Sequence, residues 1–424
     1  MRIAKSHLVD PERNQFYGIA AVALSFFIFA YSTRFGQISI LAYYAVWFPL
    51  VLVDYRRALG NYLRYGWLFA FAIFCFLSSF WSMAPSVSLR ASIQYLTHVI
   101  CALIAMRVLA PRTLALGGVV GCAAVLLYSL LFGRYLYDVL DGSYSFVGAF
   151  SSKNQLGFFA SLGILFSYGA VMIFRERGLW FVGTLMAGLL SCYALMASKS
   201  ATSVLTTLAV IGLSLVMQMS LYLAPRQRRV LFAVAIVFGG ALVTASLQFG
   251  VMDAVLGAFG KDSTLTGRTY LWQQGILAAS DTPWFGVGYQ GYWVQGFAEA
   301  ERLWNDFYIA SRSGFHFHNT WIETMVETGA LGTFMLALVL LTSLLGHLRR
   351  FLMLERSESA LLFFAISALL LVRSFVEIDI IFSYQIGSFL LYLAAGKLTI
   401  PERQNLKLFP LRRPMPAYAV TQLG

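Results

Sequence analysis

The sequence predicts an all-α, polytopic membrane protein with about twelve transmembrane helices and one long loop that carries amphipathic helices. Three observations support this fold class. The 424 residues are 59% hydrophobic and 12% charged, with a mean hydropathy of +0.72, whereas a soluble chain has about 25% charged residues. Apolar stretches of about 20 residues, the length that crosses a bilayer, recur along the chain. Basic residues concentrate in alternate connections between these stretches.

Twelve apolar stretches are long enough to be spanning helices. The first follows a polar segment with Asp10, Pro11 and Glu12, and no small-residue cleavage site follows it, so we interpret it as a retained helix rather than a signal peptide. The last two meet at the acidic residues Glu377 and Asp379. In chain order the predicted spans are 17–33, 36–53, 66–83, 93–110, 113–133, 154–174, 179–197, 201–223, 230–250, 321–346, 359–380 and 383–399.

The basic residues orient these helices, because Lys and Arg are enriched in cytoplasmic loops. With the amino terminus inside, the inner connections hold 21 of the 31 Lys and Arg residues but 7 of the 19 Asp and Glu residues. This pattern predicts a single integral membrane domain over 1–424, with both termini cytoplasmic and a basic cytoplasmic tail over 401–424. The formal charge of +12 is therefore a topology signal, and no nucleic-acid partner is expected.

Residues 251–320 form one long outer loop between the ninth and tenth predicted helices. A loop of that length is usually functional or disordered, and its many aromatic residues argue against disorder. Apolar residues at helical spacing between Trp293 and Phe307 predict an amphipathic helix whose apolar face lies on the membrane interface. A second helix is predicted from Thr266 to Ser280, capped by Thr266 and stopped by Pro283.

Basic side chains beside the predicted outer helix ends point to an anionic substrate. Partly desolvated cations near the outer leaflet are explained by a phosphorylated lipid or another anionic ligand. The alternative is that they extend to the headgroups or pair with the nearby carboxylates, which are Glu323, Glu327, Glu377 and Asp379. We favour this alternative for Arg90 and a binding role for the other four, which are Lys153, Lys199, Arg268 and Arg373.

Two further groups near the start of the tenth predicted helix are candidates for proton transfer or charge pairing. His316 and His318 directly precede that helix, and an imidazole with a pKa near 6.5 suits a general base. The alternative is an ordinary surface histidine. Glu323 and Glu327 are four residues apart and share one helix face, where they could orient an arginine, accept a proton or pair with cations.

Several familiar chemistries have no signature in the sequence. It contains no Walker-type phosphate loop, no dinucleotide glycine fingerprint and no clustered His/Cys metal spacing, so neither a metal nor a cofactor is expected. A reaction at the outer face would then need a substrate that is already activated. The cysteines lie singly inside apolar stretches and are interpreted as small buried hydrophobic residues: Cys75, Cys101, Cys122 and Cys192.

An ordered set of motifs covers residues 148 to 332. From the carboxyl-terminal end backwards these are Glu327-Thr328-Gly329-Ala330-Leu331-Gly332, His318-Asn319, Pro283-Trp284-Phe285-Gly286-Val287-Gly288, Trp272 and Gly267-Arg268-Thr269. Upstream are Ala197-Ser198-Lys199-Ser200 and Phe150-Ser151-Ser152-Lys153-Asn154-Gln155-Leu156-Gly157. The series resembles the O-antigen ligase/polysaccharide polymerase superfamily of bacterial envelopes, and the Lys-Asn-x-Leu-Gly turn resembles its exopolysaccharide branch.

The resemblance implies a metal-independent, inverting membrane glycosyltransferase in the bacterial inner membrane, with the long loop on the periplasmic side. Its donor would be a glycan linked to a polyprenyl pyrophosphate such as undecaprenyl pyrophosphate. By the same resemblance, Arg268 and Lys153 would hold the pyrophosphate with support from Lys199 and Arg373, and His318 would be the catalytic histidine, as base or as phosphate contact. The residues expected to support them are Asn154, Asn319, Glu323 and Glu327.

Three functions remain open at this point. A polymerase would join lipid-linked repeat units into exopolysaccharide, and the Lys153-Asn154 turn favours this reaction. A ligase would transfer the finished glycan to the lipid A-core. A transporter or flippase of lipid-linked sugars is the alternative from another class, but transporters usually have repeat-related halves and polar sites near the midplane. The resemblance further implies a glycan acceptor, and a flippase and chain-length regulator as partners in the same export pathway.

Overall fold

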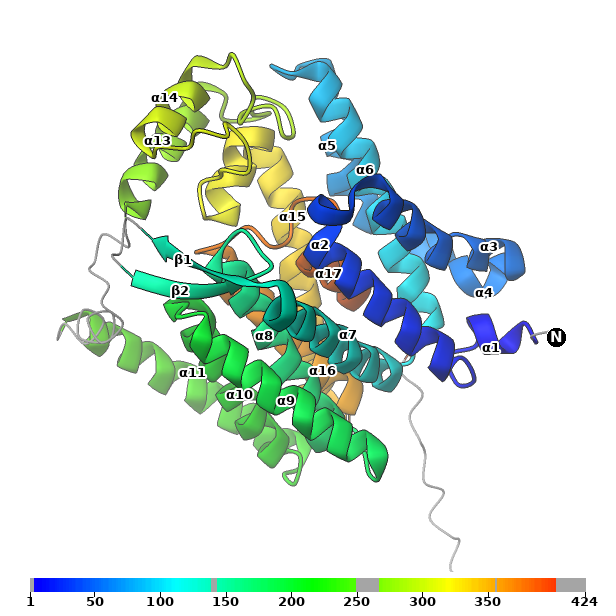
Figure 1. The fold of residues 1–424 in the computed structure, drawn as a ribbon. Coiled ribbons are helices and arrows are strands. Elements are labelled where there is room, and N and C mark those ends of the chain that lie inside the picture. The colour runs from blue at the N-terminus through cyan, green and yellow to red at the C-terminus, as the bar shows by residue number, and fades with distance from the viewer. Residues whose placement is uncertain (1–3, 139–142, 249–266, 355–356, 402–424) are drawn as a thin grey trace, which may run out of the picture.

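A computed structural model describes residues 4–138, 143–248, 267–354 and 357–401, which form a bundle of helices with a two-stranded sheet (Figure 1). The first half contains α1 (Ser6–Val9), α2 (Gln15–Trp47), α3 (Pro49–Val53), α4 (Tyr55–Leu59), α5 (Ala70–Leu77), α6 (Pro85–Val108), α7 (Pro111–Phe132), α8 (Lys153–Tyr168), α9 (Leu179–Ala197), α10 (Ala201–Ser220) and α11 (Pro225–Gln248). The second half contains α13 (Arg268–Asp281), α14 (Ala298–Asp306), α15 (Thr320–Met353), α16 (Glu358–Ser374) and α17 (Ile386–Lys397). Short helical turns flank α5 and extend α8: η1 (Tyr62–Arg64), η2 (Gly66–Phe69), η3 (Ser78–Phe80) and η4 (Gly169–Ile173).

The all-α membrane fold class is confirmed, and a helix lies at each of the twelve predicted positions. Among the described residues, seven helices are long and apolar enough to cross a membrane, or eight if the bent pair Tyr55–Arg64 and Gly66–Phe80 is one span. Helix α11 is also not among these helices, and two reasons account for the other three spans that are missing from twelve. Helices α16 and α17 have 17 and 12 residues, fewer than the roughly 20 that a span needs. The first two predicted spans also fall within a single segment, Gln15–Val53.

Helix α2 consists of two antiparallel arms. Its backbone leaves helical geometry at Gly36, where φ is 64° and ψ is −152°. Trp47 Nε1 donates a hydrogen bond to Ser25 Oγ at 3.0 Å, although a continuous helix would hold these residues about 33 Å apart. The chain therefore reverses near Gly36, in a conformation that favours glycine, and the predicted spans 17–33 and 36–53 lie side by side.

Helix α15 is interrupted at Gly329, where φ is 64° and ψ is −169°. The interruption releases backbone groups on both sides, and each unsatisfied group in a membrane segment would cost several kcal/mol. The loop 283–288 satisfies them by accepting from Ala330 N–H at 2.8 Å and by donating to the carbonyls of Val326 and Glu327 at 3.0 and 2.9 Å. A β-carbon at Gly329 would lie 2.3 Å from the backbone of this loop. The sequence motifs 283–288 and 327–332 therefore lie side by side and are joined by backbone hydrogen bonds.

The described part of the long loop, residues 267–319, packs against the start of α15. Helix α13 matches the predicted helix 266–280, and the cap predicted at Thr266 lies outside the described residues. Helix α14 is amphipathic, but its Leu303 and Trp304 side chains are buried in a cluster with Phe317. Protein therefore covers the apolar face that the sequence analysis assigned to the membrane interface.

Helices α16 and α17 occupy the centre of the bundle, and α9, α10 and α11 lie along one edge (Figure 1). Every residue of α17 from 386 to 396 is buried, as expected for a helix that is apolar all round. The edge helices instead expose large apolar side chains such as Leu208, which suits contact with lipid. The sequence analysis did not predict the antiparallel strands β1 (Arg134–Asp138) and β2 (Ser143–Gly148).

Candidate functional site

A single carboxylate, Glu377, lies at the centre of the predicted site. It follows α16 in the short connection to α17, and its side chain is 8% exposed. Side chains from three other segments point to it: Arg268 from the first turn of α13, Asn154 from the first turn of α8, and His318 from the loop before α15. Residues that are 223 positions apart in the sequence therefore meet at one carboxylate.

Arg268 is held by two hydrogen bonds from its guanidinium group. Nη2 donates to Glu377 Oε1 at 2.9 Å, and Nη1 donates to the Val376 carbonyl at 2.7 Å. The Arg268 side chain is 15% exposed, so this is a largely desolvated ion pair. Burial alone would raise the pKa of Glu377, but the His318 ring and the positive charge of Arg268 lower that pKa below its ordinary value. Glu377 is therefore ionised at neutral pH.

His318 lies beside the other oxygen of the Glu377 carboxylate. Its Nδ1 lies 3.7 Å from Glu377 Oε2, and its side chain is 28% exposed. The His318 backbone has a φ of 53°, a region that non-glycine residues rarely adopt, and its N–H donates to His316 Nδ1 at 3.1 Å. His316 thus stabilises the turn that places the His318 ring beside Glu377. Burial, followed by the charge of His318, lowers the pKa of His316 well below its ordinary value.

The residues that follow His318 fix this turn to the connection after α16. Asn319 caps α15 by accepting from the N–H groups of Trp321 and Ile322, and its Nδ2 donates to the Phe375 carbonyl at 2.9 Å. Thr320 Oγ1 donates to the Glu377 carbonyl at 2.7 Å. Asn319 therefore supports both His318 and Glu377 through the backbone.

The two predicted lysine turns meet through their neighbours. Asn154 Nδ2 donates to Glu377 Oε1 at 2.7 Å, and Asn154 Oδ1 accepts from Ser200 Oγ at 2.9 Å. Lys153 precedes Asn154, and the exposed Lys199 precedes Ser200 with a φ of 49°. Both lysines therefore belong to turns that are hydrogen-bonded to each other at the Glu377 carboxylate.

Arg373 has a different environment from the other predicted cations. It is 1% exposed, its Nε donates to Asp379 Oδ2 at 2.6 Å, and its Nη1 donates to Ser203 Oγ at 3.1 Å. Its guanidinium carbon lies 4.2 Å from the centre of the Phe158 ring. In this arrangement Arg373 ties α8 and α10 to the connection after α16, and its predicted support of a pyrophosphate stays a prediction.

Glu323 and Glu327 do not point to the Glu377 cluster. Glu323 is fully buried and accepts from Trp293 Nε1 at 2.8 Å and from the Phe317 N–H at 2.7 Å, so it holds the long loop. Glu327 is 2% exposed beside the interruption of α15. Within the described part of the chain, neither forms an ion pair with a cation. Glu323 thus fixes the long loop to the start of α15, and a supporting role of the two carboxylates in the reaction stays a prediction.

The sequence analysis treated Glu377 only as a pairing partner for cations, and the structure makes it the centre of the site. The signal that was available is an acidic residue inside an otherwise apolar stretch, which is costly and usually functional in membrane proteins. No group of three or more metal-ligating side chains with suitable geometry occurs among the described residues.

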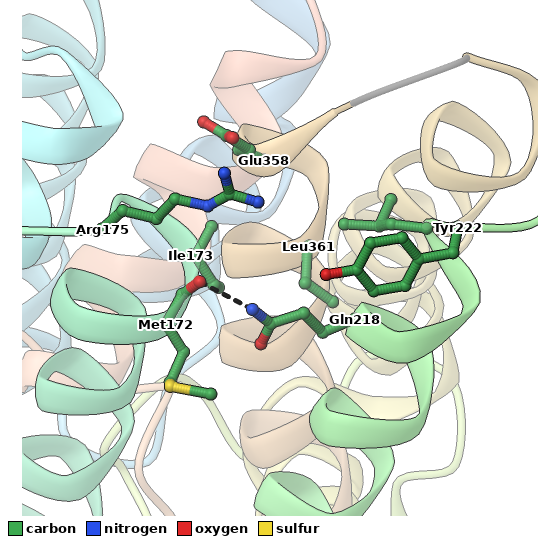
Figure 2. A pocket seen from close by; sticks show the side chains of 8 residues that line it. Met172, Ile173, Arg175, Gln218, Tyr222, Glu358 and Leu361 are labelled. Atoms are coloured by element: carbon green, nitrogen blue, oxygen red, sulfur yellow. Dashed lines mark hydrogen bonds between the residues drawn. The ribbon is translucent and has the colours of Figure 1, made fainter.

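Two cavities lie away from Glu377 and do not include Arg268 or His318. One of about 40 Å³ lies between α10 and the start of α16, where Gln218 Nε2 donates to the Met172 carbonyl at 2.6 Å (Figure 2). This volume holds no more than a few water molecules. The other, of about 700 Å³, lies among the first and last helices of the chain and is described further below.

Comparisons with known proteins agree with the motif pattern. The family described as O-antigen ligase matches residues 186–337, a range that includes Arg268 and His318. The chain is 62% identical over 405 residues to the exopolysaccharide production protein ExoQ of Rhizobium meliloti (strain 1021). The matched segment covers 96% of this chain and 93% of the relative. The chain thus belongs to the O-antigen ligase/polysaccharide polymerase superfamily of multi-pass membrane proteins.

Proposed function

We propose that this protein polymerises polyprenyl-pyrophosphate-linked oligosaccharide repeat units into exopolysaccharide at the periplasmic face of the inner membrane. The observation that carries the proposal is the convergence of Arg268, His318 and Asn154 on the Glu377 carboxylate. The name of the 62% identical relative, an exopolysaccharide production protein, favours polymerisation within the superfamily.

The proposed reaction is an inverting glycosyl transfer. The hydroxyl oxygen of the acceptor sugar forms a bond to the anomeric carbon of the donor from one face, and the bond from that carbon to the pyrophosphate oxygen breaks on the other. The acceptor proton passes to the His318 imidazole, and the electron pair leaves with the pyrophosphate. No nucleotide is consumed, because the pyrophosphate ester is already activated.

The geometry suits His318 as the general base. An imidazole that accepts a proton becomes positive, and the Glu377 carboxylate oxygen 3.7 Å away would stabilise that charge. Arg268 is placed to stabilise the leaving pyrophosphate, because arginine offers five N–H donors in a planar fork and Val376 and Glu377 use two of them. Lys153 and Lys199 add positive charge at the adjoining turns.

The proposed orientation follows from the charge distribution. The amino-terminal helix α1 and the end of α17 lie at one end of the bundle, whereas α13 and α14 lie at the other (Figure 1). Because the connections on the side of the termini hold most of the basic residues, we assign that end to the cytoplasm. The Glu377 cluster then faces the periplasm.

Arg268→Ala tests the proposal in a purified system with lipid-linked repeat units as the sole substrate. Loss of one charged transition-state contact should lower turnover by about 100-fold to 1,000-fold. Arg302→Ala is the matched control, because Arg302 lies on α14 and its ion pairs, with Glu299 and Asp306, are exposed; its other hydrogen bonds, to Tyr270 and Gln274, do not involve Glu377. Unchanged polymer formation by a folded Arg268→Ala variant would remove Arg268 from the mechanism.

A ligase of O-antigen type is the second candidate, favoured by the family match over residues 186–337. The same purified system separates the two, because a polymerase makes long chains from lipid-linked repeats alone, whereas a ligase needs lipid A-core as acceptor. Deletion of the gene separates the third alternative. A flippase would leave lipid-linked single repeats on the cytoplasmic side, whereas a polymerase would leave them on the periplasmic side.

A further inference from the structure

The cavity of about 700 Å³ lies at the end of the bundle opposite the Glu377 cluster. Helix α15 connects the two ends: between Ala330 and Arg350 it rises by about 30 Å, which equals the thickness of a bilayer's hydrocarbon core. The volume falls within the range of about 300 to 1,000 Å³ that small-molecule sites occupy. The elements that line the cavity are the α1–α2 connection, α4, the ends of α6, α15 and α17, and the start of α16.

The lining of this cavity has an excess of positive charge. Five basic residues line it, against the two carboxylates Asp10 and Glu12, and the basic residues are Arg13, Arg57, Arg107, Arg350 and Lys397. Asp10 pairs with Arg57 at 2.9 Å. Glu12 forms no ion pair within the described part of the chain. Among the described residues, the lining therefore holds fewer carboxylates than cations.

Two of these cations, Lys397 and Arg107, form no ion pair with a carboxylate among the described residues. Lys397 Nζ donates to the Leu109 carbonyl at 2.6 Å. The Arg107 guanidinium group has an unsatisfied donor, because its Nε is buried without a hydrogen-bond partner. Its positive charge also repels that of Lys397. Buried charges are normally paired, so an anion beside Arg107 and Lys397 would be stabilised by both.

His347 supplies a second unpartnered group in the same lining. Its side chain is 1% exposed, and its Nε2 lies 2.9 Å from the Ala394 carbonyl. Since a carbonyl only accepts, Nε2 carries the hydrogen and Nδ1 is an acceptor. That Nδ1 is buried without a partner. A hydroxyl group on a bound ligand would therefore satisfy His347 Nδ1 by donating a hydrogen bond to it.

We propose that this cavity binds the phosphate headgroup of an anionic phospholipid. A phosphodiester supplies the negatively charged partner that Arg107 and Lys397 lack, and a glycerol hydroxyl donates a hydrogen bond to His347 Nδ1. Apolar residues also line the cavity, among them Val9 and Phe363, which suits an amphipathic ligand better than a free ion. Basic pockets between helices at the cytoplasmic side of membranes are typical headgroup sites.

The chain's own tail is a poor alternative occupant. The segment 402–424 follows Pro401 at the lining and contains Arg403, Lys407, Arg412 and Arg413 but only Glu402 as an acidic side chain. A segment with that charge would add to the positive excess rather than neutralise it. The proposal is also independent of the proposed function, because none of the lining residues contacts Arg268, His318 or Glu377.

Native mass spectrometry of the full chain, after removal of co-purified lipid, tests the proposal. Phosphatidylglycerol should bind at one saturable site, whereas phosphatidylcholine with the same acyl chains should not. Arg107→Gln and Lys397→Gln should each weaken phosphatidylglycerol binding by about tenfold or more. Arg56→Gln is the matched control, because Arg56 is an exposed arginine on α4 outside the lining, and it should bind like the unaltered chain.

The comparison of lipids needs no variant and keeps the proposal testable if Arg107→Gln does not fold. Equal binding of both lipids by the unaltered chain would overturn the proposal, as would equal phosphatidylglycerol binding by the Arg107→Gln and Arg56→Gln variants. Inorganic phosphate is the probe for a soluble source. If it displaces phosphatidylglycerol at millimolar concentration, the site recognises phosphate but a lipid is not its ligand.

Discussion

Replacing Glu377 by Gln removes one negative charge and keeps the shape of the side chain. Its partner Arg268 is 15% exposed and would be left as a largely buried, unpaired cation. Breaking such a pair costs about 3 kcal/mol or more of unfolding free energy. The Arg302–Glu299 pair on α14 has the same separation of 2.9 Å, but its side chains are 41% and 54% exposed, so Glu299→Gln should cost less than about 1 kcal/mol.

The same replacement should affect catalysis through Arg268 and His318. Glu377 fixes both side chains, and a displacement of about 1 Å in a catalytic group lowers turnover by about 100-fold. We expect this loss for Glu377→Gln in the turnover number, since the sugar-binding surfaces are unchanged. Because part of this loss arises through Arg268, Glu377→Gln should slow the Arg268→Gln variant by a smaller factor than it slows the unaltered chain.

The assay measures initial rates of polymer formation from labelled lipid-linked repeats, with thermal unfolding in detergent as the measure of folding. Glu299→Gln serves as control in both measurements. Two results would refute the reasoning: a Glu377→Gln variant with full turnover, or rate losses for Arg268→Gln and Glu377→Gln that multiply in the double variant. Multiplied losses would mean that the two residues act independently despite their ion pair.

The remaining predictions concern the backbone and pH. Gly329→Ala should lower the free energy of unfolding by at least about 2 kcal/mol, because φ is 64° there and the new β-carbon would lie 2.3 Å from the loop backbone. The control is Gly212→Ala on α10, which has open space around it and should be neutral or slightly stabilising. Equal effects of the two substitutions on thermal unfolding would contradict this account. His316 has a lowered pKa in the folded protein, so the unfolded chain binds the proton first as the pH falls. Stability should therefore decline below about pH 6.5, by up to about 1.4 kcal/mol per pH unit, and His316→Asn should flatten the decline measured between pH 6.5 and 5.

The helices could be predicted from the sequence because membrane burial gives a strong local signal. Helix α9 has the predicted limits, 179 to 197, since charged or turn-forming residues end the apolar stretch at both sides. The placement of Arg268 and His318 near each other also followed from the order of the motifs. The signal for the helix is contained in one short segment, and the signal for the two site residues is contained in an ordered series of motifs.

Pairings between distant segments could not be predicted in this way. Glu377 lies in a stretch whose composition suits either a partner for a cation or the centre of a site, and only its contact with Asn154 decides. The interruption at Gly329 is hidden, because the apolar pattern continues through it. The apolar face of α14 could be recognised from its spacing, but whether lipid or Phe317 covers it depends on how residues 267–319 fold.

The ion pair at Glu377 has a consequence for how the proposed donor binds. A pyrophosphate that enters beside Glu377 brings negative charge next to a carboxylate, which is unfavourable unless more than one cation responds. Arg268 keeps three of its N–H donors for this purpose, and the turns of Lys153 and Lys199 adjoin the same carboxylate through Asn154. Without donor, Glu377 neutralises Arg268 and keeps it oriented at little electrostatic cost. When the proposed donor is bound, we expect the lysines to supply the extra positive charge, so that Glu377 would remain ionised beside His318 during transfer of the acceptor proton.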